Sequence, residues 1–495
     1  MALSKEVYQE FEDIVSEENI CADSAIMPAY FSVNFDAVIL PKDTAEVQAI
    51  VKLCNKHKVK FRPISTGWTG SYSPNMILID LRRMNHIIEI NEKNMYAVVE
   101  PYVISGQLQA ELFKRGLNMN MKGAGSNCSA LLRGHGHMDE TTSGDDRNHL
   151  AIEWVTPEGE LVKVGALGSV DEWFSGDGPG PSLRSLITTV MPPGVTPGVF
   201  TKAAIKIYHW PGPTSYPVVG KSPKYTLSEI PKYMMARYFS FPSIDKMWQA
   251  ELRIGENEIA FVQMGFHISM VACNLTTSNE GEVELFNKIS KEVLGPGFLV
   301  ILAGHSEADF AHKKKTLEKI ISDAGGESLK VVEDSENEGI IMCQCSRISA
   351  SIREVFRAAG AHNSIPVMGQ RDLVIKWAIG AGKAKEELIK QRLIIDDGGS
   401  FFGWGVEQGH IGKTECLCRY SIFEPKAKSA VEKWTREQTN RALNENYFAN
   451  LYLEGMMDKA GPRLCNYHLW WRKFRKIIDP NGVTPEGGSA LMTTE

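Results

Sequence analysis

Three histidines occupy glycine-rich stretches in which they could act as acids or bases. His135 and His137 lie within residues 120–147, a long segment rich in Gly, Ser and His that shows no helical or strand periodicity. Segments of this kind inside a compact domain are often functional. His410 lies in a second glycine-rich stretch, residues 404–412. Because histidine titrates near neutral pH, each of the three is a candidate to accept a substrate proton.

The first of these segments also has the composition of a metal site. His135, His137, Asp139 and Glu140 stand close together in the sequence. Two imidazoles and a carboxylate are the ligands of many hydrolytic zinc sites. A zinc hydrolase is therefore an alternative to acid–base chemistry at this segment.

Two cysteine pairs offer a second metal alternative. The nine cysteines are scattered along the chain, which favours reduced thiols over a disulfide framework. In the pairs Cys343/Cys345 and Cys416/Cys418 one residue separates the thiols. Structural metal sites usually space their cysteines by two to four residues, whereas residues i and i+2 share one face of a strand. We therefore interpret both pairs as strand residues, with a shared metal or iron–sulfur site as the alternative.

An anion-binding loop is predicted at residues 62–72. Its sequence, RPISTGWTGSY, follows a short apolar strand at 59–61 and precedes a second strand at 76–81. Backbone N–H groups in such a Ser/Thr/Gly loop can converge on a pyrophosphate. The loop has neither the Gly-Lys-Ser/Thr ending of a nucleoside-triphosphate loop nor a GxGxxG motif entering a helix. The expected ligand is therefore a dinucleotide held in another fold, and the alternative is a plain connection between strands.

Composition and charge exclude several classes of protein. The chain has 495 residues, of which 43% are hydrophobic and 23% charged, which is enough for two or three domains. The net charge of −6 argues against a nucleic-acid-binding surface. No run of apolar residues is long enough to predict a transmembrane helix. The first residues show no apolar signal region, which favours a cytoplasmic location.

The elements around these motifs follow an α+β pattern. A strand begins at Val38, and Thr44 is expected to cap a helix with apolar residues at helical spacing: Val47, Ile50, Val51 and Cys54. Further elements predicted in the first half are strands at 77–81, 87–90, 97–99 and 201–208, a helix at 105–115, and a hairpin of 151–155 with 161–164. In the second half they are strands at 299–302 and 329–332, a helix at 307–324, and helix-rich regions at 347–392 and 430–478.

Taken in order, the motifs of the first 213 residues resemble one known family. They are similar to the FAD-binding domain of vanillyl-alcohol oxidase, p-cresol methylhydroxylase and the FAD-linked 2-hydroxy-acid dehydrogenases. The resemblance rests on VILPKDTAEVQ at 38–48, PISTG at 63–67, LRRMNHI at 81–87, YAVVEP at 96–101, RGHG at 133–136, EWVTPEGEL at 153–161, GVFTK at 198–202 and DPNG at 479–482. Each motif alone is weak, but their common order makes the resemblance specific.

The resemblance implies an α+β fold in three parts. It implies a two-subdomain FAD-binding domain at residues 1–215, an α+β substrate or cap domain at 216–440, and a helical C-terminal segment at 441–495 that returns to the FAD-binding domain. The cofactor would be FAD, and no metal is expected because the family pattern already accounts for the histidine segment. The implied cofactor-binding residues are Pro63, Ile64, Ser65, Thr66, Gly67, Trp68, Thr69, Pro101, Ser129, Gly134, His135, Gly136, Gly144, Ile152, Gly198 and Val199.

The resemblance also adds two tyrosines to the catalytic candidates His135, His137 and His410. In phenol-oxidising members a Tyr near the end of the pyrophosphate loop faces the substrate, and Tyr72 has that spacing. Those members also have a Tyr-Arg pair before the DPNG motif that stabilises a phenolate. Its best counterpart here is Tyr447, which is followed by Phe448, so the Arg is missing.

A phenolate in an apolar pocket without that cation would be costly, and this departure puts phenol oxidation in doubt. Packing at a domain interface is the alternative role of both tyrosines. One of the histidines could instead attach the flavin covalently, although the pyrophosphate loop lacks the His that some members use.

We therefore predict an FAD-dependent oxidoreductase, either a dehydrogenase or an oxidase. It would transfer a hydride from a small organic alcohol or alkyl-aromatic substrate to flavin N5. One alternative is an FAD-linked 2-hydroxy-acid dehydrogenase, whose substrate carboxylate would need Arg347, Arg371 or Arg419. Another is a flavoprotein electron-transfer subunit of a larger redox complex. The expected partners are a small-molecule substrate, an unidentified electron acceptor such as a redox protein, and further copies of the chain.

Overall fold

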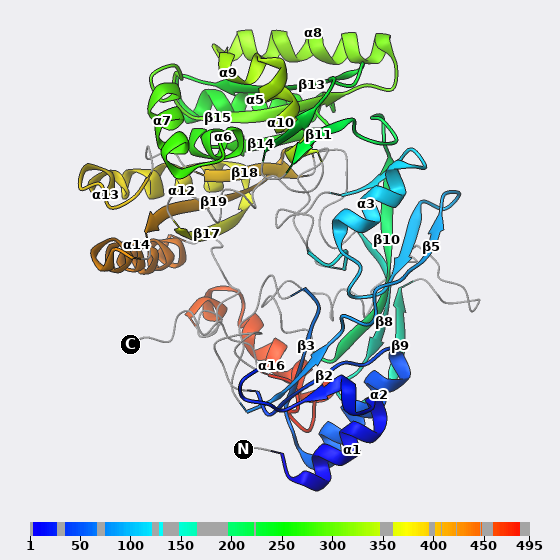
Figure 1. Cartoon of the computed structure of the whole chain (residues 1–495). Helices are drawn as coiled ribbons and strands as arrows, with labels where there is room; N and C mark the ends of the chain where they lie inside the picture. Colours follow the sequence, from blue (N-terminus) through cyan, green and yellow to red (C-terminus); the bar gives the residue numbers. More distant parts are fainter. Residues whose placement is uncertain are drawn as a thin grey trace.

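The computed structural model describes most of the chain in separate stretches. These are residues 3–26, 35–66, 75–120, 128–131, 148–165, 197–221, 224–346, 360–395, 401–406, 408–421, 423–445, 447 and 459–485. They form sheets of four, six, two and seven strands, with the four-stranded sheet at one end of the molecule and the helix-covered seven-stranded sheet at the other (Figure 1). Among the helices in these stretches, none has the length and apolar character needed to span a bilayer.

The first sheet contains the expected parallel strands. Its order is β1 (Ile20–Cys21), β2 (Ala37–Ile39), β4 (Ile77–Asp80) and β3 (Phe61–Ile64). The last three run parallel, whereas β1 is antiparallel to β2. Helices α1 (Lys5–Val15) and α2 (Thr44–His57) pack on this sheet and share its buried core.

Helix α2 has the predicted buried face but a different cap. The residues at helical spacing, Val47, Ile50, Val51 and Cys54, are all buried. Asp43, not Thr44, caps the helix, and its carboxylate accepts the N–H of Glu46 at 2.9 Å. The hydroxyl of Thr44 donates instead to Glu153. The carboxylate of Asp43 reaches the unpaired N–H groups of the first helical turn, so the predicted cap was wrong by one residue.

The second sheet is antiparallel and includes the predicted hairpin. Its order is β5 (Ile87–Asn91), β6 (Tyr96–Val99), β10 (Val199–His209), β8 (His149–Val155) and β9 (Leu161–Gly165), and β7 (Leu117–Met119) also pairs with β10. Strands β8 and β9 form the expected hairpin. Helix α3 (Ser105–Phe113) packs against the sheet, with Leu108 and Leu112 in its core.

The third sheet, which we call the cap sheet, has seven strands. Its order is β16 (Glu327–Ser328), β13 (Met234–Ser240), β15 (Gly297–Ala303), β14 (Val262–Phe266), β18 (Phe401–Val406), β19 (Ile411–Ser421) and β17 (Gly360–Gln370). In β15, alternate residues enter two different cores. Phe298 and Val300 pack with helices α5 (Ile244–Glu256) and α8 (Glu307–Ala324). Leu299 and Ile301 pack on the other face, with the core that includes α6 (Ile268–Leu275) and α10 (Ser335–Cys345).

Other elements complete the described chain. The hairpin of β11 (Val218–Lys221) and β12 (Lys224–Leu227) precedes the cap sheet. The remaining helices are α7 (Asn279–Ile289), α9 (Lys330–Glu333), α12 (Arg371–Lys383), α13 (Glu386–Lys390), α14 (Pro425–Asn444) and α16 (Tyr467–Ile478).

Two predicted elements of this part were wrong. Residues 329–332 were expected to form a strand, but Lys330–Glu333 is the short helix α9. Cys343 and Cys345 lie on helix α10, not on a strand, whereas Cys416 and Cys418 do lie on β19. Short apolar runs fit both a strand and a buried helix, so periodicity alone could not separate them. The region at 347–392 also contains β17 in addition to its helices.

One continuous core joins the second sheet to the cap sheet. Trp210, just after β10, stacks on Phe113 with ring centroids 4.4 Å apart and meets Phe261 edge-on at 4.7 Å. Polar contacts add to this joint, because Ser346 accepts from Gln109 at 3.2 Å and bonds to the hydroxyl of Tyr216 at 2.6 Å. The two parts of the molecule are therefore fixed to each other around Trp210.

A buried carboxyl group lies between helix α5 and its neighbours. Glu251 is only 1% exposed, and a guanidinium nitrogen of Arg371 lies 3.5 Å from its carboxylate. Burial raises the pKa of Glu251 to about 7, although Arg371 opposes the shift. Removing the charged carboxylate of Glu251 from water costs free energy, and its attraction to Arg371 offsets only part of that cost.

Replacing Glu251 by glutamine is expected to remove a pH dependence of stability. The pKa of this carboxyl is about 7 in the folded protein and 4.5 ordinarily, so between these values the folded state holds a proton that the unfolded chain lacks. In the native chain the free energy of unfolding should therefore fall by up to about 3 kcal/mol as the pH rises through this window, and stay constant above it. The Glu251→Gln variant should lack this fall. Unfolding in urea between about pH 5 and about pH 8 measures this slope.

The matched control is Glu256→Gln, because Glu256 is exposed on the same helix. This control should keep the pH slope of the native chain. Equal slopes for Glu251→Gln and the native chain would contradict the prediction.

Candidate functional site

The predicted pyrophosphate loop starts at the carboxyl edge of the first sheet. Strand β3 ends at Ile64 opposite Asp80, the last residue of β4, and the half-buried Ser65 and Thr66 follow. Ligands of open parallel sheets bind outside the carboxyl ends of the strands. Asp80 is buried, and its carboxylate accepts the N–H and the Nε–H of Arg82 at 3.0 and 2.7 Å. The rest of the expected loop, Gly67, Trp68, Thr69 and Tyr72, lies outside the described residues.

Pro101 and Ser129, both predicted to bind the cofactor, lie in direct contact. The Ser129 hydroxyl donates to the carbonyl of Pro101 at 2.6 Å and accepts the N–H of Leu131 at 3.1 Å. The N–H of Ser105 binds the carbonyl of Cys128 at 2.8 Å. The hydroxyl of Ser105 is buried and finds no hydrogen-bond partner within the described stretches. A buried polar atom left over at this position suits a bound polar group.

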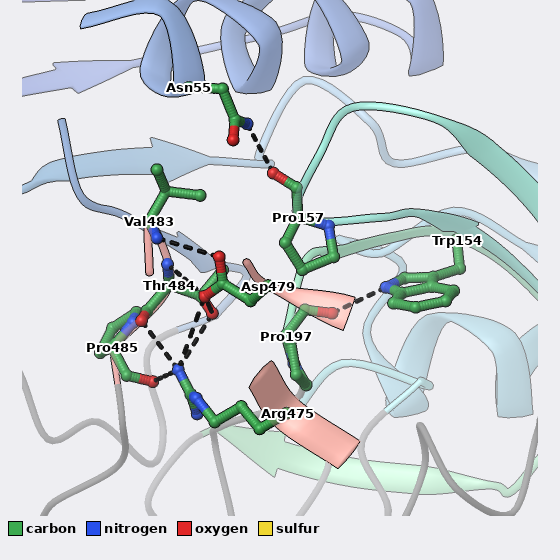
Figure 2. A network of polar contacts seen from close by, with 9 residues as sticks. All are labelled: Asn55, Trp154, Pro157, Pro197, Arg475, Asp479, Val483, Thr484 and Pro485. Atoms are coloured by element: carbon green, nitrogen blue, oxygen red, sulfur yellow. Dashed lines mark hydrogen bonds and ion pairs between the residues drawn. The ribbon is translucent and has the colours of Figure 1, made fainter. Parts of the chain in front are cut away.

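Gly198 occupies the junction between the first and second sheets. Its φ of +87° is one that other residues rarely adopt, and a Cβ there would lie 2.3 Å from the carbonyl oxygen of Val155. The indole N–H of Trp154 donates to the carbonyl of Pro197 at 2.8 Å (Figure 2). Val155 and Val199 are buried in the core of the first sheet. The close approach of the Val155–Thr156 backbone and the Trp154 indole, together with the positive φ, therefore requires glycine here.

Ile152, another predicted cofactor residue, lies farther along β8. It is 1% exposed and pairs with Ala203 of β10. Its side chain belongs to the core that continues toward the cap sheet. The structure thus brings Gly198 and Val199 to the first sheet, whereas Ile152 sits on the other side of the junction.

The DPNG turn anchors the C-terminal segment beside β3. Asp479 accepts the N–H groups of Val483 and Thr484 at 3.0 and 2.9 Å, and Arg475 lies 3.9 Å from its carboxylate (Figure 2). The carbonyl of Val483 accepts the N–H of Phe61, the first residue of β3, at 2.9 Å. The turn is therefore bonded to the strand that leads into the pyrophosphate loop.

A second bond chain ties this turn to helix α2 and the β8–β9 hairpin. Asn481 donates to the side chain of Asn55 at 2.8 Å, and Asn55 donates to the carbonyl of Pro157 at 2.6 Å. The C-terminal segment is thus bonded directly to the first sheet and, through Asn55, to the hairpin of the second.

Glu153 is a connecting residue that the sequence analysis did not single out. One oxygen of its buried carboxylate accepts from the side chains of Thr44, Thr201 and Lys202 at 2.7, 2.9 and 2.8 Å. Burial alone would raise the pKa of Glu153, but the hydrogen bonds from Lys202 and Thr44 outweigh it and hold the pKa below its ordinary value. The only sequence signal was the place of Glu153 at the start of the EWVTPEGEL motif.

The histidine candidates are not brought together within the described residues. His135 and His137, with Gly134, Gly136 and Gly144, lie outside them. His410 is exposed in the turn between β18 and β19, where the neighbouring Gln408 donates to Glu258 at 3.3 Å. Among the stretches that the structure covers, no cluster of three His, Cys, Asp or Glu is suited to a metal ion.

Tyr447 lies against an arginine that the sequence analysis did not pair with it. Its ring is buried, and the guanidinium carbon of Arg441 lies 5.8 Å from the ring centre. Burial, together with the hydrogen bond to Glu445, raises the pKa of Tyr447. Arg441 itself binds Glu445 at 3.1 Å and Gln438 at 3.3 Å. An arginine is thus present near this tyrosine, but it comes from the preceding helix and already pairs with a carboxylate.

Comparison with known proteins identifies the cofactor domain. The FAD binding domain family matches residues 35–165. The chain is 29% identical over 201 residues to 1'-carboxy-chondrochloren decarboxylase of Chondromyces crocatus, covering 36% of each chain. It is 33% identical over 115 residues to the 4-cresol dehydrogenase (hydroxylating) flavoprotein subunit of Pseudomonas putida, covering 20% of this chain and 22% of that one. These matches therefore span well under half the length of either relative.

Solved structures match over nearly the whole chain. A 4-ethylphenol oxidase from Gulosibacter chungangensis has a TM-score of 0.72 and 17% identity, covering 97% of this chain and 96% of that one. p-Cresol methylhydroxylase has the same TM-score of 0.72 with 15% identity, covering 97% and 95%. At this level of identity the likeness shows the fold.

The match at residues 35–165 covers the strands that lead to the carboxyl edge of the first sheet, so the chain contains an FAD binding domain. Ser65 and Thr66 follow β3 at this edge, and within the described residues the buried hydroxyl of Ser105 has no hydrogen-bond partner. The whole chain has the fold of p-cresol methylhydroxylase and of the 4-ethylphenol oxidase, and its FAD binding domain indicates FAD as the cofactor. The predicted fold class and cofactor are confirmed.

Proposed function

We propose that the protein oxidises a small, uncharged alcohol or alkyl-aromatic substrate. When bound, FAD supplies the hydride acceptor, at N5 of its ring system. The backbone after β3, at Ser65 and Thr66, would hold the pyrophosphate, and Pro101, Ser129 and Gly198 would hold the rest of the cofactor. The names of two relatives, a 4-cresol dehydrogenase and a 4-ethylphenol oxidase, support an alkyl-aromatic substrate.

The observation that carries the proposal is that Arg419 and Arg371, two arginines of the cap region, already have partners within the protein. Arg419 and Glu282 form an ion pair in which both side chains are almost fully buried, at 3% and 2% exposure. Arg371 lies beside Glu251, donates to the carbonyls of Trp248 and Gly409, and stacks 4.8 Å from the Trp248 ring. A buried cation that already has a carboxylate, as Arg419 does, or that already donates to two carbonyls, as Arg371 does, is a poor site for a substrate carboxylate.

This pairing favours an uncharged substrate over a 2-hydroxy acid. The third candidate cation, Arg347, lies outside the described residues. The 2-hydroxy-acid alternative keeps support from two relatives named as D-2-hydroxyglutarate dehydrogenase and D-lactate dehydrogenase. It therefore remains the second hypothesis, and its substrates belong in the same test.

The chain must also move a proton from the substrate hydroxyl. His135 and His137 remain our proposed bases, because they belong to the glycine-rich segment next to the flavin in the family pattern. His410 is less suited, since its side chain is exposed at a hairpin turn. Tyr72 and Tyr447 remain proposed substrate-side residues. Tyr447 would act as a neutral phenol, because its pKa is raised and the nearby Arg441 pairs with Glu445.

The electron acceptor is proposed to be separate from the chain. One relative is named as the flavoprotein subunit of its enzyme, which supports a redox partner protein. A flavoprotein that only relays electrons within a complex would need no small-molecule substrate, and this distinguishes it from the proposal above.

An anaerobic reduction screen tests the substrate class. The FAD-loaded protein is mixed with benzylic alcohols, 4-alkylphenols or 2-hydroxy acids, and the visible absorbance of the flavin is followed. We expect bleaching by members of the first two groups and none by hydroxy acids. Bleaching by hydroxy acids alone would favour the second hypothesis, and bleaching by no compound would favour the electron-transfer role.

A further inference from the structure

Helix α16 exposes large apolar side chains on its outer side. Its inner side is fixed to the protein, with Trp471 and Arg475 buried. On the outer side Leu469, Trp470 and Ile477 are 45%, 66% and 74% exposed. Exposed side chains of this size gathered on one short helix mark an interaction surface more often than a chance arrangement.

The same side of the helix is strongly basic. Residues 459–478 contain six Lys or Arg and no Asp or Glu, in a chain whose net charge is −6. Arg472, Lys473 and Lys476 are exposed on α16. The ammonium group of Lys473 lies 4.7 Å from the ring centre of Trp470.

The apolar and basic side chains form one continuous surface. Trp470, Lys473 and Ile477 are three and four residues apart, so they follow one another along the helix. Leu469, Lys473 and Lys476 form the adjacent row. We call this surface the α16 outer face and define it by Leu469, Trp470, Arg472, Lys473, Lys476 and Ile477.

We propose that the α16 outer face binds the surface of a membrane that contains anionic lipids. Tryptophan and lysine are the residues that settle at the headgroup level of a bilayer, while Leu and Ile enter the acyl boundary. Each lysine or arginine near an anionic surface adds attraction. A helix of 12 residues is about 18 Å long, so it would lie in the plane of the interface.

Charge argues for lipid over other occupants. A two-fold contact between copies of the chain would place these cations against each other. A protein partner would normally meet a surface poor in lysine, because lysine is depleted in protein interfaces. On the α16 outer face lysine lies between the apolar side chains, so each apolar side chain can insert separately between lipid headgroups.

The face is also held ready for binding. Arg475 on the inner side donates to the carbonyl of Thr484 at 2.8 Å and lies beside Asp479. Asp479 in turn binds the N–H of Val483, whose carbonyl accepts the N–H of Phe61, so the helix is linked to strand β3. Membrane contact therefore needs no rearrangement of the protein and does not depend on which substrate is oxidised.

Vesicle flotation with the FAD-loaded full chain tests the proposal. We expect binding to vesicles of phosphatidylcholine and phosphatidylglycerol in equal parts, little binding to phosphatidylcholine alone, and release by salt. The variant Lys473→Glu/Lys476→Glu should bind at least about thirtyfold more weakly, which corresponds to two lysines at about 1 kcal/mol each. The variant Trp470→Ala/Ile477→Ser should bind at least about tenfold more weakly.

Two matched controls change equally exposed residues elsewhere. Phe423 is 84% exposed after β19, and Lys426 and Lys428 are exposed on α14. The variants Phe423→Ala and Lys426→Glu/Lys428→Glu should bind vesicles as the native chain does. All four variants should keep the flavin spectrum, because none of these residues belongs to the cofactor site.

Three results would overturn the proposal. One is equal binding to neutral and anionic vesicles, or none to either. Another is unchanged binding of both α16 variants. The third is a dimer in analytical ultracentrifugation that the α16 variants dissociate, which would show that a second copy covers this face.

Discussion

Replacing Gly198 by alanine should lower the free energy of unfolding by about 2–5 kcal/mol and reduce the FAD content of the purified protein. Alanine at a φ of +87° is strained, and its methyl group would lie 2.3 Å from the carbonyl oxygen of Val155 and 2.6 Å from the indole nitrogen of Trp154. The first neighbour is backbone of strand β8, and the second is a ring that cannot move without breaking the Trp154–Pro197 bond. Urea unfolding and the ratio of flavin to protein absorbance measure the two effects.

The control Gly116→Ala separates the cost of a positive φ from the cost of crowding by the added methyl group. Gly116 also has a positive φ, +67°, but no atom lies within 4 Å of the position of an added Cβ. This control should cost only about 1–2 kcal/mol and keep FAD bound. If the two variants are equally stable and equally loaded with FAD, the crowding at Gly198 has no role.

The second large effect is expected at Asp479. Asparagine would keep the shape of the side chain but remove the charge that faces Arg475 and one acceptor of the turn. We expect a loss of about 2–4 kcal/mol, because Arg475 would be left buried without a carboxylate. Hydrogen exchange should show faster exchange at Phe61, Val483 and Thr484, whose amides depend on this turn.

The control for this variant is Asn481→Ala. Asn481 is exposed and makes one side-chain bond, to Asn55. Its loss should cost within about 1 kcal/mol. Asp479→Asn behaving like this control, with unchanged exchange at Phe61, would show that the carboxylate does not hold the turn.

The ends of a helix could be predicted from the sequence where a single neighbouring residue fixes where the helix starts or stops. The helix predicted at 307–324 is α8 at those bounds. Ser306 caps its start by accepting the N–H of Asp309, and Gly325 ends it at a φ of +70°. Cap and stop residues act within one turn of the helix, so they can be read from the sequence.

Contacts between distant residues could not be predicted in this way. The cap of α2 was misplaced because Thr44 bonds to Glu153, which is 109 residues away. The pairing of Arg419 with Glu282 joins residues 137 apart, and it removed a candidate for substrate binding. Gly198 was singled out by its motif as a cofactor-binding residue, which stays a prediction, and the crowding that requires glycine there depends on how β8 and β10 pack.

The bond between Phe61 and Val483 has a consequence for biosynthesis. During translation the first sheet emerges from the ribosome long before Val483, which supplies its carbonyl to β3 and a buried side chain to the core of that sheet. The first sheet therefore cannot be completed until the cap sheet and the C-terminal segment have been synthesised. A chain interrupted before residue 483 would lack this bond and this core side chain, so its first sheet should be less stable than in the full chain.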